Sequence, residues 1–329
     1  MPRVGDVLTH STDQRQTTAN VPTAFTQAAN STVIELGHQP FDLRATLKPL
    51  QHGHFDPTMQ VSASQAWRAT RTPEGPGTIH LQHDENRILV STSGPGAAWL
   101  TGNARELLGL DRPQPHLQLE VRALYDAQRR ARGLRLCRSR AVFEAAIPSV
   151  IEQRVTSSEA VRSFRSLTLA LSEPAPGPCG NNLYLPIDPA TLAKAPAWSF
   201  HKYGIEAKRA NVLRSIARHS RFLDAIADGD PAQYCKQLMK VPGIGAWTAA
   251  EISAPSLGDS DAVSVGDFHL KNFVCWNLAG EARGTDERMC ELLEEFRPHR
   301  GWVVRLILQS GSRPPKFGPR YSPLPIAEM

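Results

Sequence analysis

Residues 238–252 read LMKVPGIGAWTAAEI, and this stretch decides the fold that we expect. One proline and two glycines, Pro242, Gly243 and Gly245, separate two segments of helical character, so a tight turn is predicted here. Glycine can adopt a positive φ angle, and without a Cβ atom it lets another group come close to its backbone. The stretch therefore predicts a short hairpin between two helices.

The limits of these two helices follow from the neighbouring residues. The first is expected over 231–239, with Pro231 in its first turn, where the missing N–H is harmless. The second is expected over Ala246–Ala254 and to end before Pro255, because proline disrupts the interior of a helix. We interpret the whole segment as a helix-hairpin-helix.

Three interpretations of the turn compete. Its Gly-x-Gly spacing approaches a dinucleotide-binding fingerprint, but Thr248 replaces the third glycine and a helix, not a strand, precedes it. The second interpretation is a turn that only separates two helices and binds nothing. The third is phosphate binding, because the first N–H groups of a helix lack internal partners and lie at the positive end of its dipole. Such a hairpin holds a nucleic-acid backbone without reading sequence, and its residues are Val241, Gly243, Ile244, Gly245 and Thr248, with Ile244 expected to point inward.

A candidate catalytic carboxylate lies downstream, in DAVSVGDFHLKN (261–272). The simplest role of Asp267 is the N-cap of a helix expected over Phe268–Leu278. A capping carboxylate tends to stay ionised through contact with backbone amides, as a group that stabilises positive charge must. Asp259 and Asp261 offer the same chemistry, but they are expected earlier in the loop and solvated.

The hairpin followed by this loop resembles the HhH-GPD superfamily of base-excision DNA glycosylases. Within it, the chain is most similar to the 3-methyladenine DNA glycosylase II group, whose members remove alkylated bases. The resemblance covers Val142 to Gly311, and it includes three further segments: FEAAIPSVIEQRVT (143–156), GIEAKRA (204–210) and RPHRGW (297–302). It implies a mainly α fold, in which an HhH-GPD helical core follows a small α+β N-terminal domain.

The chain is predicted to have three parts. Residues 1–31 contain few large apolar side chains and are expected to be a flexible N-terminal tail. Residues 32–115 are assigned to a small antiparallel α+β domain, in which the runs 78–82 and 87–91 form a hairpin of strands. Residues 116–329 are assigned to the helical HhH-GPD catalytic core.

The resemblance implies roles for two residues. Asp267 matches the catalytic aspartate of the family, whose carboxylate stabilises positive charge on the sugar and orients the attacking water. Trp247 stands where members that also cut the DNA backbone carry a nucleophilic lysine, so a monofunctional enzyme without AP lyase activity is expected. The ring of Trp247 is expected to line the base pocket and attract a cationic purine, with a core aromatic as the alternative.

The chain departs from the best-known branch of the family in its pocket. Glu251 stands where that branch has an aromatic residue, and Leu308 where it has a tryptophan. Glu251 is therefore expected to be a polar pocket residue or to pair with a neighbouring lysine or arginine.

Three residues are candidates for further DNA contacts. The resemblance places Gln153 and Arg154 where the family inserts a wedge into the base stack, and an ordinary surface arginine is the alternative. Lys208, next to Arg209, is expected at a helix start, where either side chain contacts phosphate or forms a salt bridge.

No catalytic cofactor is expected. The resemblance implies a structural Na⁺ or K⁺ at the backbone carbonyls of Val241 and Ile244, and the four-cysteine pattern of an iron–sulfur cluster is missing. The histidines lack further ligands at zinc-finger spacing. We therefore interpret His52, His54, His80 and His83 as surface residues and His269 as structural.

The composition is that of a globular chain with a mild basic excess. The 329 residues include 37 Lys and Arg against 32 Asp and Glu, which is compatible with a polyanionic partner. Seven arginines fall between Arg122 and Arg140, either as a solvated helix face or as a phosphate-contacting surface. Scattered cysteines and the lack of a secretory or membrane-spanning segment favour the cytoplasm.

These observations predict a monomeric, monofunctional DNA glycosylase that acts on alkylated bases in double-stranded DNA. Two alternatives stay open. One is a glycosylase of the same fold for deaminated or oxidised bases, which Glu251 makes plausible. The other is a catalytically inactive DNA-binding protein that retains the hairpin.

Overall fold

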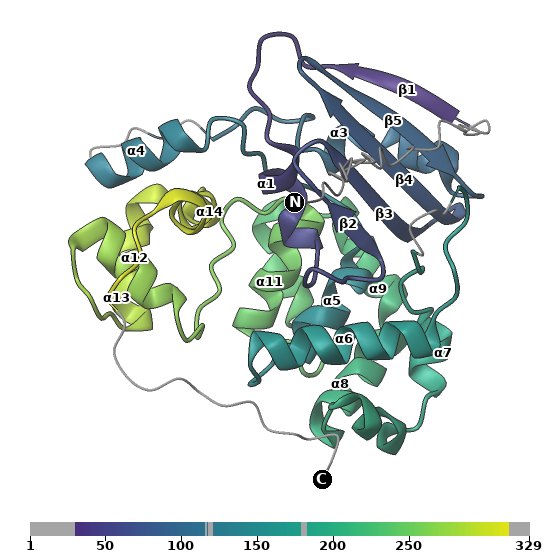
Figure 1. Ribbon diagram of the computed structural model, residues 1–329. Helices are drawn as coiled ribbons and strands as arrows, with labels where there is room; N and C mark the ends of the chain where they lie inside the picture. The colour runs from purple at the N-terminus through teal and green to yellow at the C-terminus, as the bar shows by residue number, and fades with distance from the viewer. Residues whose placement is uncertain (1–29, 116, 118–120, 179–182, 316–329) are drawn as a thin grey trace, which may run out of the picture.

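The computed structural model describes residues 30–115, 117, 121–178 and 183–315 (Figure 1). Most of the predicted tail lies outside the described residues. Its last two positions do not belong to a tail, because the first strand, β1, already begins at Asn30.

The amino-terminal part is built on an antiparallel sheet of five strands in the order β1-β5-β4-β3-β2. The strands are β1 (Asn30–Glu35), β2 (Met59–Val61), β3 (Gln65–Thr72), β4 (Gly75–Asp84) and β5 (Arg87–Ser93). The predicted hairpin is confirmed as β4 and β5, in which Leu81 pairs with Val90 and both side chains are buried.

Short helices cover one face of this sheet. They are α1 (Leu43–Leu47), the 3₁₀ helix η1 (Lys48–Leu50), α2 (Ala97–Gly102) and α3 (Ala104–Leu107). Leu43 and Leu100 from the helices share one apolar core with Ile79 and Val90 from the sheet. Burial of these side chains fixes the sheet against its helices.

The rest of the described chain is predominantly helical, as predicted, apart from residues 172–178 and 183–188, which hold an isolated β-bridge between Pro174 and Tyr184. It contains α4 (Arg122–Arg130), α5 (Val142–Ile151), α6 (Ser157–Leu171), α7 (Pro189–Lys194), η2 (Ala197–Tyr203), α8 (Ala207–Arg218), α9 (Ser220–Ala225), η3 (Ile226–Asp228), η4 (Pro231–Gln233), α10 (Tyr234–Leu238), α11 (Ala246–Leu257), α12 (Leu270–Ala279), α13 (Asp286–Leu293), η5 (Glu294–Phe296) and α14 (Arg300–Ser310). The fold is mainly α with a small antiparallel sheet, which confirms the predicted class.

Helix α5 lies at the centre of the largest core and packs against α6, α8, α9 and α11. Its sequence, VFEAAIPSVI, is apolar on nearly every side, and such a helix is stable only when it is surrounded. Helices α12, α13 and α14 form a second group with α4, and in Figure 1 this group lies to the left of α11 and α5.

The predicted ends of the hairpin helices need correction. The segment 231–239 is split into the 3₁₀ turn η4 and α10. Helix α11 does not stop before Pro255 but continues to Leu257, where Gly258 ends it in the left-handed conformation. The backbone of Ser139 donates to the carbonyl of Pro255, so a neighbouring segment supports the last turn. None of the helices in the described part of the chain is long and apolar enough to cross a membrane.

Candidate active site

The hairpin joins α10 to α11, and its two glycines differ. Gly243 has φ +95°, and a Cβ atom there would lie 2.5 Å from the side chain of Val212. Gly245 has φ −96°, and nothing lies within 4 Å of the position of its Cβ. Ile244 between them is buried in the central core and anchors the turn. This confirms the prediction that its side chain points inward. Only Gly243 therefore needs to be glycine for the turn itself.

The start of α11 presents backbone donors to solvent. Gly245 and Ala246 are exposed, and Trp247 is half-buried. No hydrogen bond between described residues uses the N–H groups of these three positions. Free amides at the positive end of a helix suit an anion, so the geometry is compatible with phosphate binding.

Gln153 ties the turn after α5 to the hairpin. Its Nε2 donates to the carbonyl of Gly243 at 3.1 Å and to Oγ1 of the buried Thr248 at 2.9 Å. Its neighbour Arg154 is exposed, with φ +58°. Of the two residues predicted as a wedge, Gln153 is thus engaged within the protein and Arg154 projects from it.

Asp267 caps the start of α12 and also contacts α11. Its Oδ1 accepts hydrogen bonds from the N–H groups of His269 and Leu270, both at 2.7 Å. Its Oδ2 accepts from Nε1 of Trp247 at 3.4 Å. The helix begins at Leu270, two residues later than predicted, because residue 267 bonds to the amides of 269 and 270. Three donors thus fix the carboxylate in one orientation.

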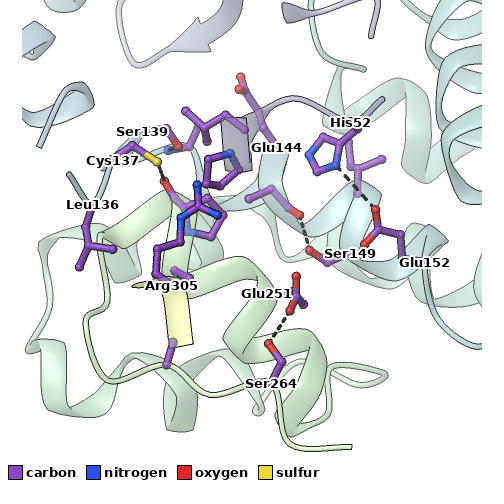
Figure 2. A pocket seen from close by; sticks show the side chains of 18 of the residues that line it. His52, Leu136, Cys137, Ser139, Glu144, Ser149, Glu152, Glu251, Ser264 and Arg305 are labelled. Carbon is purple, nitrogen blue, oxygen red and sulfur yellow. Dashed lines mark hydrogen bonds and ion pairs between the residues drawn. The ribbon is translucent and has the colours of Figure 1, made fainter. Parts of the chain in front are cut away.

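A cavity of about 400 Å³ lies between the sheet and the helices, and Asp267 is among its lining residues. Figure 2 shows this cavity, with Glu251, Glu152 and His52 around it. Leu308 lines it too, and is half exposed. Trp247 is not among the described residues that line it, but its Nε1 donates to Asp267, which does, so its role in the base pocket stays a prediction. The alternative of a core aromatic is wrong, because Trp247 is partly exposed and belongs to none of the described apolar cores.

Glu251 lies on α11 one turn beyond Trp247 and faces the cavity. Its Oε1 accepts a hydrogen bond from the hydroxyl of Ser264 (Figure 2). Burial, together with the charges of Glu152 and Asp267, raises the pKa of Glu251 to about 7 against the opposing effects of Ser264 and His52. In the described part of the chain Glu251 has no ion pair with lysine or arginine, so that predicted alternative is wrong.

His52 is a cavity residue that the sequence did not reveal. It belongs to the loop after η1, and its Nδ1 lies 3.8 Å from Oε1 of Glu152 at the end of α5. Its ring packs edge-on against Phe164 of α6, with the centroids 5.2 Å apart. The surface interpretation of His52 was wrong, since no local pattern marks a loop that folds back onto a distant helix.

Two other histidines also differ from their prediction. His80 is buried and stacks on Trp67 with 3.7 Å between the ring centroids, and burial lowers its pKa to about 4. It is therefore a neutral core residue, not a surface one. His269, expected to be structural, is exposed and lines the cavity beside Asp267.

The rival carboxylates are held within the protein. Asp261 forms hydrogen bonds with the guanidinium of Arg300 at 2.6 and 2.9 Å. Asp259 accepts a hydrogen bond from the N–H of Asp261 at 3.0 Å. The prediction that both are solvated is wrong. Neither is among the described residues that line the cavity, whereas Asp267 is.

The predicted cationic contacts are only partly available. Arg209 is buried and donates to the carbonyl of Ile151 at 2.7 Å, which leaves Lys208 as the exposed cation at the start of α8. In the arginine-rich segment, Arg135 is buried, and Arg138 and Arg140 both form ion pairs with Glu106. The exposed arginines of that segment are Arg122, Arg129, Arg130 and Arg132.

In the described chain, no group of three or more histidine, cysteine, aspartate or glutamate side chains could hold a metal ion. The four cysteines within the described ranges are free.

No protein-family model matches the chain. It is 28% identical over 219 residues to a Mycobacterium tuberculosis protein named as a probable bifunctional transcriptional activator and DNA repair enzyme, AlkA. That match covers 62% of this chain and only 42% of the relative.

Solved structures match over more of the chain. A 3-methyladenine DNA glycosylase from Archaeoglobus fulgidus has a TM-score of 0.69 at 18% identity, covering 84% of this chain and 97% of that one. An 8-oxoguanine glycosylase/lyase from Clostridium acetobutylicum has a TM-score of 0.67 at 14% identity, covering 85% and 96%. The chain therefore shares the fold of these two DNA glycosylases.

Proposed function

We propose that this chain is a DNA glycosylase that hydrolyses the N-glycosidic bond of an alkylated base in double-stranded DNA. The observation that carries the proposal is the carboxylate of Asp267, which two backbone amides and the indole of Trp247 orient at a cavity of about 400 Å³. A cavity of this size accommodates a single purine. Solved structures named as a 3-methyladenine DNA glycosylase and an 8-oxoguanine glycosylase/lyase share the fold of this chain.

The bound duplex would be held without regard to sequence. The free amides of Gly245 and Ala246 suit one phosphate, and Lys208 offers a second contact from α8. A base inside the helical stack cannot reach the cavity, so the nucleotide must turn outward. Arg154 is exposed and stands at the wedge position of the family, so we assign it to fill the space that the displaced base leaves in the stack.

The chemistry then follows from the fixed carboxylate. As the base departs, positive charge develops at C1′ of the deoxyribose, and the carboxylate of Asp267 stabilises it. Because amides hold the carboxylate in advance, little reorganisation accompanies the reaction. Water completes the hydrolysis, and the indole of Trp247 offers no amine to attack the sugar. An intact strand with an abasic site is the expected product.

The hairpin carbonyls also fit the monovalent cation that the resemblance implies. The carbonyl of Val241 accepts one hydrogen bond, from the N–H of Ile244, and retains a second lone pair. No hydrogen bond between described residues uses the carbonyl of Ile244. A Na⁺ or K⁺ held by these two oxygens would add positive charge beside a DNA phosphate.

Excision of a deaminated or oxidised base is the second candidate, because the carboxyl group of Glu251 in the cavity, when protonated, can donate a hydrogen bond to the polar edge of a neutral base. A panel of duplexes that each carry one modified base, followed by alkaline cleavage at abasic sites, tests both candidates. Strand breaks that form before alkali would contradict hydrolysis by water alone.

The first prediction concerns Asp267. We expect Asp267→Asn to abolish base release, because the amide keeps the cap but lacks the negative charge. Affinity for a duplex with a stable abasic analogue should change little, since the hairpin is intact. Release at the wild-type rate would refute the assignment, and release by neither protein would favour a DNA-binding protein without activity.

A further inference from the structure

The two carboxylate oxygens of Glu251 differ in their contacts with the protein. Ser264 occupies Oε1, and Oε2 has no hydrogen-bond partner among the described residues. The side chain lines the cavity, and Figure 2 shows it between the loop of Ser264 and helix α5. A carboxylate removed from bulk water is unfavourable unless a donor or a cation meets it. The free oxygen is therefore available to a donor or a cation that enters the cavity.

The charges that act on Glu251 come from three separate elements. Glu152 at the end of α5 and Asp267 before α12 are negative, and His52 lies in the loop after η1. His52 and Glu152 are within 3.8 Å of each other, so the imidazole offsets the charge of Glu152 when it is protonated. The two carboxylates make this end of the cavity negative and able to accept a positive guest.

The other charged groups that line the cavity are already paired. Arg68 forms an ion pair with Glu144 at 2.8 Å. Arg135 donates to the carbonyl of Pro40, and Arg305 donates to the carbonyl of Ala45. His269 beside Asp267 and the thiol of Cys137, whose pKa burial raises to about 11, are the remaining titratable lining groups among the described residues. None of the three arginines forms a described ion pair with Glu251.

Resting on the proposed function, we propose that Glu251 determines specificity, with Glu152 and His52 as positioning residues that set its charge. The negative carboxylate selects a base that carries a positive charge over a neutral base of similar size. Glu251 and Leu308 stand where the best-known branch of the family has two aromatic residues. The base is therefore selected by its charge and not by stacking on those two rings. Glu251 would be ionised above a pH of about 7 and protonated below it, so selection should strengthen as pH rises.

The test compares two single-turnover rate constants of base release from duplex DNA. One substrate is 3-methyladenine, which is cationic in the nucleoside, and the other is hypoxanthine, which is neutral. Their ratio cancels the steps that the substrates share. In the wild-type protein the ratio should rise about tenfold between about pH 6 and pH 8. Glu251→Gln should give a low ratio that does not vary with pH.

Two further variants separate a role in charge from a role in structure. His52→Gln removes a group that lowers the pKa of Glu251, so the rise should move to higher pH. Glu152→Gln removes a group that raises this pKa, so the rise should move to lower pH. A purely structural defect would not displace the profile in opposite directions. Glu295→Gln, an exposed carboxylate on η5, is the control and should match the wild-type protein.

Binding to a duplex with a stable abasic analogue checks that each variant is folded. A wild-type ratio and pH profile retained in Glu251→Gln would overturn the specificity assignment alone. Absence of release of either base by the wild-type protein would overturn the proposed function itself. A higher ratio in Glu251→Gln would show that the carboxylate selects the neutral base, and would also overturn the inference.

Discussion

The fold holds the carboxyl group of Glu251 where ionisation is unfavourable, and stability must therefore depend on pH. The unfolded chain ionises this group near its ordinary pKa of 4.5, whereas burial raises the pKa in the folded protein to about 7. Between these values the folded state binds a proton that the unfolded state has released. The contribution of Glu251 to the free energy of unfolding is therefore complete below a pH of about 4.5 and is lost as pH rises to about 7.

Replacement of Glu251 by glutamine should stabilise the protein at alkaline pH. The amide keeps an acceptor for Ser264 and carries no charge. We expect Glu251→Gln to gain up to about 3 kcal/mol relative to the wild-type protein at pH 8, and little at pH 4.5. Urea unfolding across this range measures the difference. A difference that does not vary with pH would show that Glu251 ionises normally in the folded state.

At the scale of the element, the hairpin depends on one glycine and not on the other. We expect Gly243→Ala to lose about 2–4 kcal/mol, because alanine disfavours φ +95° and its Cβ would overlap the side chain of Val212. The matched variant Gly245→Ala adds a methyl group in open space and should change stability by less than about 0.5 kcal/mol. Chemical denaturation compares the two, and equal losses would contradict the assigned turn.

The Gly245 variant also reports on DNA binding. Its added methyl group lies beside the free amides at the start of α11. Under the proposed function, Gly245→Ala should weaken binding to a duplex with an abasic analogue while stability is unchanged. Unchanged affinity would show that the DNA backbone does not approach this position.

Elements with a local signal could be predicted, and those fixed by distant contacts could not. The turn at Gly243 and the cap at Asp267 follow from the chemistry of a few adjacent residues. The extension of α11 through Pro255 depends on the segment at Ser139, which is far away in sequence. His52 reaches the cavity only because its loop packs on α6. No sequence period encodes such contacts.

At the scale of the whole molecule, the cavity exists because the sheet is fixed to the helical part. Glu144 on α5 is the main polar link, and it is largely buried. Its carboxylate accepts from Arg68 and from the hydroxyl of Thr70, both at 2.8 Å, and from the N–H of Arg71 at 2.7 Å. All three donors belong to β3. A single carboxylate thus accepts from three donors of one strand.

Removal of one partner from this link should be more harmful than removal of both. Glu144→Ala leaves the Arg68 guanidinium buried without a counter-charge, and we expect a loss of about 3–5 kcal/mol. The double variant Arg68→Met, Glu144→Met replaces the pair by apolar groups and should recover much of that loss. The exposed pair of Arg87 with Asp84 is the control, and Asp84→Asn should cost less than about 1 kcal/mol. Urea midpoints of the four proteins form the measurement.

The same variants test whether the two parts act together. If the sheet positions His52 and the cavity wall, Glu144→Ala should reduce base release more than it reduces affinity for an abasic duplex, because the hairpin lies wholly in the helical part. The double variant, with the sheet docked again, should regain release in proportion to its stability. Full release by Glu144→Ala under conditions in which the sheet is detached would mean that the helices alone form the catalytic site.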